Sequence, residues 1–193
     1  MTDLASRIDL DRGILSGGTL TERRLSQLGE AFVDQRALQT MLSRGEDPLI
    51  YTVSTLEYGS AHGDLHVGLG VLFPGRVGRE YFLTKGHRHL RAEAAEVYLG
   101  LRGTGKMILQ DSSATSVVDL LPNGTVYVPG HTDHRTVNTG EEPLVYLGIY
   151  PAWSGHDYHA LREHPFSLVI LEEHGTSTIH KRAEVLASFH GHP

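Results

Sequence analysis

The sequence TKGHRHLRAEAAEVYLGLRG, residues 84–103, decides the fold class expected for this chain. On a β-strand, side chains two residues apart point to the same face, so His87 and His89 face one side with Cα atoms roughly 6.5–7 Å apart. Glu96 opens the next predicted strand, and its carboxylate reaches the same point if the two strands lie side by side. Two imidazoles and a carboxylate so placed are typical ligands of a divalent metal ion.

A second block, VPGHTDHRTVN at residues 128–138, extends this pattern. His134 follows a Pro-Gly turn and is the candidate for a fourth ligand. An H-x-H pair alone is weak evidence, but the spacings E-x6-G, P-x4-H and H-x3-N accompany it, with glycine or proline where a barrel must turn. Three imidazoles and one carboxylate suit Fe2+, Mn2+, Ni2+ or Zn2+ and disfavour calcium, which prefers oxygen ligands.

Short β-type runs separated by turn signals continue on both sides of these blocks, from Pro48 onward. Many short strands at this spacing predict an all-β sandwich or barrel. Residues 34–44 have helical spacing of apolar residues, with Asp34 as the N-cap and Gly45 after the end. The expected strands lie within residues 49–58, 66–73, 79–87, 95–103, 106–111, 116–121, 124–130, 135–140 and 143–151, and a terminal hairpin is expected over residues 166–181.

The composition indicates one globular domain: 193 residues, 39% hydrophobic and 21% charged. We divide it into an N-terminal arm (1–47), a barrel (48–171) and a terminal strand and tail (172–193). The chain has no cysteine, which excludes disulfides, thiolate ligands and a cysteine nucleophile. A net charge of −6 argues against a nucleic-acid partner. Without a long apolar run or a signal-peptide pattern, we expect no membrane partner and a cytoplasmic protein.

The two blocks together resemble the two cupin motifs, with His131 where the second motif usually has glycine. The T-K-G-H-x-H run and the G-H-D-Y at residues 155–158 resemble one branch, the cupin-type (archaeal-type) glucose-6-phosphate isomerases, from about Arg23 to Ile170. The resemblance implies an all-β cupin barrel, a double-stranded β-helix or jelly roll, with an N-terminal arm that contains a short helix. It also implies a homodimeric, metal-dependent aldose–ketose isomerase that interconverts glucose 6-phosphate and fructose 6-phosphate.

The resemblance also assigns a role to individual residues. It implies one divalent ion per subunit, Fe2+ first and Mn2+, Ni2+ or Zn2+ as alternatives, and a small sugar phosphate as substrate. The implied metal ligands are His87, His89, Glu96 and His134. The implied substrate-binding residues are Tyr51, Thr84, Gly86 and Tyr150, and the implied catalytic residues are Glu96, Tyr98 and His156.

One departure concerns Gly70, which stands where the archaeal form has a threonine that contacts phosphate. Loss of a hydroxyl contact weakens binding by about 0.5–1.5 kcal/mol unless a water replaces it. Three other charged residues are expected to lie away from the site. Lys85 and Arg135 alternate away from the histidines beside them, and Arg23 is expected on a solvated face. His190 and His192 are expected in a frayed tail.

Other functions remain open from the sequence. The chain is alternatively another cupin metalloenzyme, with mannose-6-phosphate isomerase activity or an Fe(II) dioxygenase reaction, or a non-catalytic sugar-binding cupin. For the isomerase, Glu96 is the best-placed base to move a proton between C1 and C2. A direct hydride shift is the rival mechanism, and the sequence does not separate the two.

Overall fold

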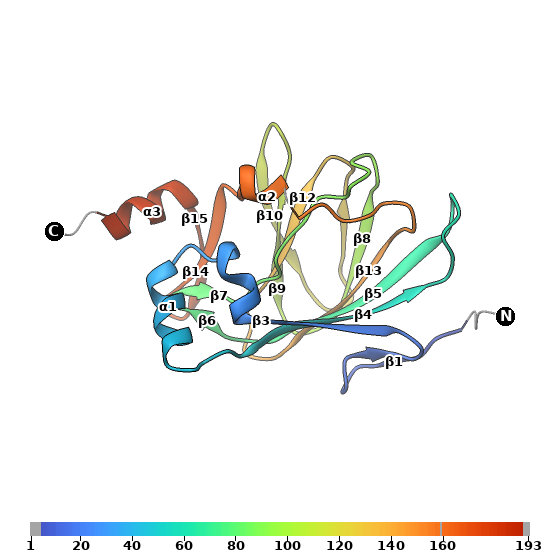
Figure 1. Ribbon diagram of the computed structural model, residues 1–193, viewed down its shortest axis with the longest axis horizontal. Helices are drawn as coiled ribbons and strands as arrows, with labels where there is room; N and C mark the ends of the chain where they lie inside the picture. Colours follow the sequence, from blue (N-terminus) through green and yellow to red (C-terminus); the bar gives the residue numbers. More distant parts are fainter. Residues whose placement is uncertain (1–4, 159, 191–193) are drawn as a thin grey trace.

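The structure is a computed structural model, and it describes residues 5–158 and 160–190. A six-stranded antiparallel sheet forms the larger layer and runs across the whole body (Figure 1). Buried residues alternate with less buried ones along residues 96–100 and 125–128, whereas residues 68–72 in the middle of the sheet are all buried, so the sheet is covered on both faces there. Its strand order is β11 (Thr125–Val128), β8 (Glu96–Arg102), β13 (Leu144–Pro151), β5 (Leu65–Leu72), β4 (Leu49–Glu57) and β3 (Thr19–Arg24).

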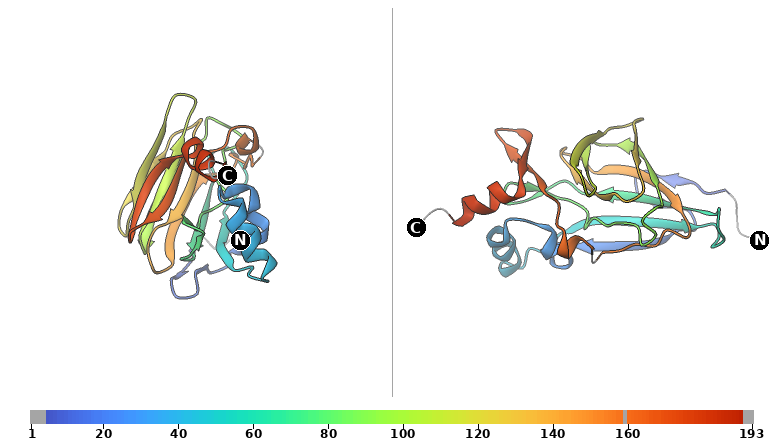
Figure 2. Two further views of the ribbon diagram at one scale, coloured as in Figure 1. Left: turned by 90° about the vertical axis from the view of Figure 1, so that its left-hand side faces the viewer. Right: turned by 90° about the horizontal axis from the view of Figure 1, so that it is seen from above.

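A three-stranded sheet faces this layer and closes the barrel (Figure 2). Its order is β10 (Thr115–Leu120), β9 (Gly105–Gln110) and β12 (Asp133–Asn138). Asn138 joins the two layers, because its side-chain amide donates to the Leu72 carbonyl of β5 at 2.8 Å. The all-β cupin fold expected from the motifs is therefore confirmed.

Smaller elements lie around the barrel. They are the hairpin of β1 (Ile8–Asp9) and β2 (Ile14–Leu15), the 3-10 helix η1 (Leu25–Ala31), the helices α1 (Gln35–Ser43), α2 (Ala160–Glu163) and α3 (Arg182–His190), and a sheet of order β15 (Thr176–Lys181), β14 (Leu168–Glu173), β7 (Glu80–Tyr81) and β6 (Arg76–Val77). The predicted helix is confirmed, with Asp34 accepting from the Ala37 N–H at 2.8 Å. The predicted terminal hairpin, β14–β15, is confirmed too.

The hydrophobic core fills the space between the sheets and continues under η1 and α1. Leu72, Met107 and Leu144 are fully buried between the layers, and Phe32 and Leu38 extend the core beneath the helices. Burial of this kind is the main favourable contribution to folding. No helix among the described residues has the length and apolar character needed to span a membrane.

The structure differs from the sequence-based expectation in three places. The strand expected over residues 79–87 is limited to β7, because Gly86 has a φ of +76° and breaks the extended backbone. His87 instead forms an isolated bridge with His134. Residues 19–24, placed in the arm, form β3 at the edge of the main sheet. The C-terminal segment forms α3 up to His190 rather than a frayed tail, and His192 lies outside the described residues.

Glu80 carries a testable pH dependence of stability. Its side chain is 2% exposed, Oε2 accepts from the Val33 N–H at 2.6 Å, and Oε1 has no hydrogen-bond partner. Burial raises its pKa to about 7, although the Val33 hydrogen bond and the Arg135 charge lower it. Because the folded protein keeps this proton longer than the unfolded chain, unfolding free energy falls as pH rises from about 4.5 to 7.

The unfolding free energy of the parent should fall by about 3 kcal/mol as the pH rises through this range, since one pKa unit corresponds to about 1.4 kcal/mol. We predict that Glu80→Gln abolishes this fall. The amide keeps an acceptor for Val33 and carries no charge. Urea unfolding at pH 5 and pH 8 measures the effect. The variant and the parent should be similar at pH 5, and the variant should be more stable at pH 8. Parallel pH profiles for the two proteins would contradict this assignment.

Candidate active site

Four potential metal ligands converge on one point inside the barrel. Glu96 comes from β8 of the large sheet, His134 comes from β12 of the facing sheet, and His87 and His89 come from the loop after β7. One ligand atom from each of the four lies within 4.8 Å of the others. The Glu96 carboxylate lies 3.1 Å from Nε2 of His134 and 3.3 Å from Nε2 of His89. The structure therefore brings the predicted ligand set together.

Backbone hydrogen bonds hold the histidines in this arrangement. His87 and His134 exchange a pair of backbone bonds, from the His134 N–H at 2.9 Å and from the His87 N–H at 3.1 Å. Nδ1 of His89 lies 3.0 Å from the Ala94 carbonyl, and Nδ1 of His134 lies 3.2 Å from the Thr132 carbonyl. A carbonyl only accepts, so each Nδ1 carries the proton. The Nε2 atoms of both rings are then free to bind a metal.

The residues present fit a divalent cation. Nε2 of His87 and Nε2 of His89 are buried without a hydrogen-bond partner. Nε2 of His89 and Nε2 of His134 both point at the Glu96 carboxylate, at 3.3 and 3.1 Å, so these groups direct their ligand atoms at one point where a cation would be held. Gly148 on β13 leaves the room that this carboxylate needs, since a Cβ there would lie 2.5 Å from Oε1 of Glu96.

The charge states of these groups also suit metal binding. Burial alone would raise the pKa of Glu96, but contacts with His134 and His89 outweigh it and lower the pKa to about 2. Burial and the neighbouring histidines hold the pKa of His87 well below its usual value. The carboxylate is thus ionised and the imidazole neutral near pH 7, which are the ligand-competent forms.

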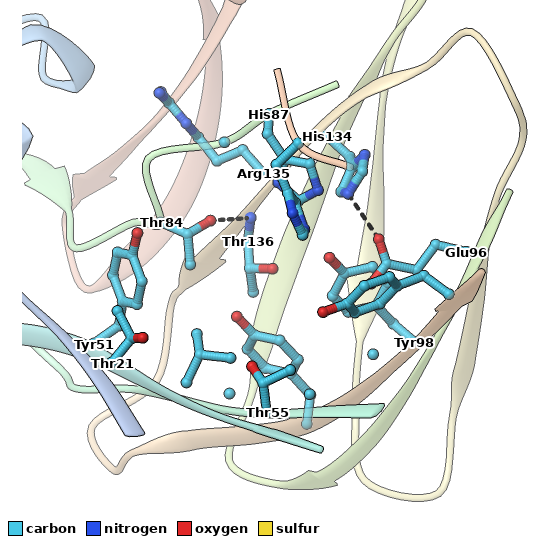
Figure 3. Close-up of a pocket in the computed structure, with 18 of the residues that line it drawn as sticks. Thr21, Tyr51, Thr55, Thr84, His87, Glu96, Tyr98, His134, Arg135 and Thr136 are labelled. Carbon is cyan, nitrogen blue, oxygen red and sulfur yellow. Dashed lines mark hydrogen bonds and ion pairs between the residues drawn. The ribbon is translucent and has the colours of Figure 1, made fainter. Parts of the chain in front are cut away.

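A cavity of about 210 Å³ opens beside the ligand cluster. It is smaller than the roughly 300–1,000 Å³ typical of drug-sized ligands, so it suits a small polar molecule. Glu96, Tyr98 and His134 lie at one end of the view in Figure 3, and Tyr51 and Thr84 lie at the other. The cavity therefore has an end beside the ligand cluster and an end lined by hydroxyl groups.

The other predicted site residues also line this cavity: Tyr51, Thr84, Gly86, Tyr98, Tyr150 and His156. Thr84 Oγ1 accepts from the Thr136 N–H at 3.1 Å. The ring of His156 lies 4.5 Å from that of His87, measured between centroids. Burial lowers the pKa of His156, and burial together with Glu96 raises that of Tyr98 well above its usual value. His156 is therefore a neutral imidazole and Tyr98 a protonated phenol at neutral pH.

Sequence reasoning missed several residues of the cavity wall. Arg23, expected on a solvated face, lines the cavity, as does Thr21 two residues earlier on β3. Because Thr21 and Arg23 are two residues apart on a strand, their side chains point to the same face, and this spacing was the signal in the sequence that could have placed Arg23 in the cavity wall. Arg135, expected to point away from His134, does direct its guanidinium away from the ligand cluster (Figure 3). The residue is buried, with 5% of its surface exposed, and it is one of the residues that line the cavity.

Tyr146 on β13 explains the glycine at position 70. A Cβ on Gly70 would lie 2.4 Å from Cζ of Tyr146 and 2.7 Å from its hydroxyl oxygen. The Tyr146 ring lines the cavity and is 6% exposed. The tyrosine therefore fills the space that a side chain at position 70 would need, and it places a phenol on that part of the wall.

We predict that Gly70→Ala lowers the unfolding free energy by about 1–3 kcal/mol, because the added methyl group displaces a buried ring. Gly68→Ala is the matched control on the same strand. Its Cβ would lie 3.5 Å from the nearest atom, an ordinary contact with Val53. Denaturant unfolding of both variants measures the difference. Equal stabilities for the two alanine variants would show that Tyr146 does not restrict position 70.

Comparison with known proteins identifies similar sequences over most of the chain. A family model described as Glucose-6-phosphate isomerase (GPI) matches residues 22–186. Glucose-6-phosphate isomerase of Thermococcus onnurineus is 44% identical over 170 residues, covering 88% of this chain and 89% of that protein. The protein of the same name from Pyrococcus furiosus is 43% identical with the same coverage. That from Sinorhizobium medicae is 36% identical, covering 81% and 74%.

Solved structures give a weaker likeness. Oxalate oxidase in complex with the substrate analogue glycolate aligns with 14% identity and a TM-score of 0.49, covering 58% of this chain and 56% of that one. A likeness at this level says nothing about the reaction.

Proposed function

Because the chain belongs to the glucose-6-phosphate isomerase family, we propose that it interconverts glucose 6-phosphate and fructose 6-phosphate with one bound divalent metal ion. The observation that carries this proposal is the cluster of His87, His89, Glu96 and His134 at one end of the cavity, with ligand atoms within 4.8 Å of one another. We propose Fe2+ as the ion. Mn2+, Ni2+ and Zn2+ suit the same donor set.

A divalent ion held by these residues supplies a Lewis acid that polarises the carbonyl of the open-chain sugar. Other groups of the protein hold the metal-binding side chains in position. Carbonyl groups of Ala94 and Thr132 fix the rings of His89 and His134, and such supporting contacts set both metal affinity and ligand orientation. Burial of His89, Glu96 and His134 limits the access of bulk water to this end of the cavity.

We assign the phosphate of the substrate to the far end of the cavity. Thr84 offers a hydroxyl group, and Tyr51 lies near it in Figure 3. Gly86, which also lines the cavity, has no side chain to cover its backbone. A Cβ at position 86 would lie 2.8 Å from Cε2 of Phe166 and 3.2 Å from the His134 carbonyl oxygen, and the φ of +76° there favours glycine. Arg23 adds the positive charge that a dianion requires in a chain of net charge −6.

We assign proton transfer between the two adjacent carbons to Glu96. Its carboxylate is ionised, and the phenol of Tyr98 contacts it from the same strand. A proton donor in that position holds the carboxylate in one orientation. His156, a neutral imidazole beside Tyr150 at a ring distance of 5.4 Å, can accept and return the hydroxyl proton of the sugar. Tyr150 packs against the substrate on that side.

Solvent exchange separates this assignment from a direct hydride shift. Turnover in deuterated water should incorporate label at C1 or C2 of the sugar, because a carboxylic acid exchanges its proton with solvent. Mass spectrometry of the isolated product measures the label. Complete retention of the original hydrogen over many turnovers would exclude Glu96 as the proton carrier.

One assay tests the function itself. Protein loaded with Fe2+ or Mn2+ without oxygen should convert fructose 6-phosphate to glucose 6-phosphate, and a chelator should stop it. Mannose 6-phosphate as the product would instead indicate the related isomerase. Oxygen consumption would indicate a dioxygenase. Sugar-phosphate binding without turnover would indicate a binding module, and each of these three results would overturn the proposal.

The family resemblance further supports a cytoplasmic homodimer with a sugar phosphate as its small-molecule partner. Light scattering of the purified full chain measures the mass directly. A monomeric mass at working concentration would contradict the dimer.

A further inference from the structure

A second cavity, of about 270 Å³, lies behind the wall of the first. Four cationic side chains line it, and the single acidic residue of the lining is Glu30. This concentration of positive charge is unexpected in a chain with a net charge of −6. The four cations come from separate segments of the chain: Lys85, Arg135, Arg162 and Arg182.

Arg135 forms the buried floor of this cavity. Nη1 donates to the Ala31 carbonyl at 3.2 Å, Nη2 donates to the Lys85 carbonyl at 2.8 Å, and the guanidinium carbon lies 4.7 Å from the centre of the Phe166 ring. These contacts hold the guanidinium in one position. Its Nε is buried without a hydrogen-bond partner, although the side chain is 5% exposed. A buried donor without a partner is costly, so a ligand that accepts from this side chain gains binding energy.

The cations of the cavity are poorly neutralised. Within residues 5–158 and 160–190, Arg162 forms an ion pair with Glu30 at 2.9 Å, and both side chains are exposed at the rim. The ammonium group of Lys85 lies over the Tyr158 ring at 4.8 Å. Arg182 begins α3. The carboxylate of Glu80, which accepts from the Val33 N–H, attracts both Arg182 and Arg135, so Glu30 and Glu80 together offset only part of the charge of the four cations. The cavity thus presents a surplus of positive charge around a fixed guanidinium.

We propose that this second cavity is a binding site for a small oxyanion, a phosphate group or a compact dicarboxylate, distinct from the catalytic cavity. Guanidinium groups bind such anions through paired, charge-assisted hydrogen bonds. Arg135 at the floor, Arg182 on one wall and Arg162 at the rim supply three such groups. The site adjoins the catalytic wall, because Arg135 follows His134 in β12 and holds the carbonyl next to Gly86.

Selenate tests this proposal, because it is a tetrahedral oxyanion that X-ray anomalous scattering locates without ambiguity. Crystals of the full chain soaked over a selenate concentration series should show a peak in contact with Arg135 and Arg182, separate from any peak in the catalytic cavity. Inorganic phosphate added to the soak should displace it. Malonate in place of phosphate shows whether a compact dicarboxylate is also accepted.

Two variants test whether Arg182 and Arg162 bind the anion. Arg182→Gln and, separately, Arg162→Gln should each raise the selenate concentration for half occupancy, by about tenfold for Arg182→Gln, because a charged hydrogen-bond donor is lost. Arg182 keeps its backbone bond to the Ser167 carbonyl in the variant. Arg79→Gln, which removes a surface pair with Glu173, is the control and should leave occupancy unchanged. No peak in the second cavity, or equal occupancy in all three variants, would overturn the proposal.

Discussion

Replacing Glu96 with glutamine is expected to lower kcat by about 10³-fold or more and to leave a folded protein. The carboxylate is 4% exposed and lies within 3.3 Å of two imidazole nitrogens. A neutral amide is a poor metal ligand and no proton acceptor. Its NH2 group can, however, donate to Nε2 of His89 or of His134 and satisfy a lone pair there. The metal-free variant should therefore stay folded, with a lower thermal stability than the metal-free parent because it lacks the ionised carboxylate that His134 and His89 stabilise.

Steady-state kinetics measure the expected loss of kcat, and thermal unfolding without metal measures the stability of the variant. Glu172→Gln is a suitable control, because Glu172 carries the same charge and pairs with Arg76 at the surface at 3.2 Å. The control should keep its full kcat. A Glu96→Gln enzyme with kcat within a few-fold of the parent would remove Glu96 from the reaction.

Replacing His89 with alanine should weaken metal binding by about a hundredfold or more. Loss of a supporting contact to a ligand already costs about 10–100-fold in affinity, so loss of the ligand itself costs at least as much. His89 is 3% exposed, and its ring is oriented by the Ala94 carbonyl. The parent should gain about 2.7 kcal/mol in unfolding free energy at a metal concentration of 100 Kd. The variant should gain almost nothing at that concentration.

Metal content after desalting, together with unfolding curves at several metal concentrations, measures this effect. His180→Ala is the control, because His180 contacts Glu173 at 3.2 Å on the terminal hairpin, outside the ligand cluster. The control should retain metal and the metal-dependent stabilisation. Undiminished metal content in the His89→Ala protein would show that His89 is not a ligand.

Local sequence patterns predicted the features that depend on nearby residues. Asp34 caps α1 because its carboxylate accepts from an N–H three residues later. The two-residue spacing of His87 and His89 indicated a shared direction, and both reach the cluster although the backbone between them is not a regular strand. Glu96 and His134 were placed by motif spacing, and facing sheets bring them together.

Features that depend on contacts between distant segments were not predictable in this way. Arg135 is buried because carbonyls from residues 104 and 50 positions earlier in the chain accept from it. Gly70 is a glycine because the Tyr146 ring of a neighbouring strand occupies its side-chain space. Arg23 lines the cavity because β3 joins the edge of the main sheet. A single sequence carries no record of which segments meet.

The central claim is that three imidazoles and one carboxylate share a single cation inside the barrel. Anomalous diffraction at the manganese edge, from crystals grown with Mn2+, tests it most directly. We predict one strong peak, bonded to Nε2 of His87, His89 and His134 and to a carboxylate oxygen of Glu96. A map with no peak among these four side chains, or with the peak bound elsewhere, would contradict the account.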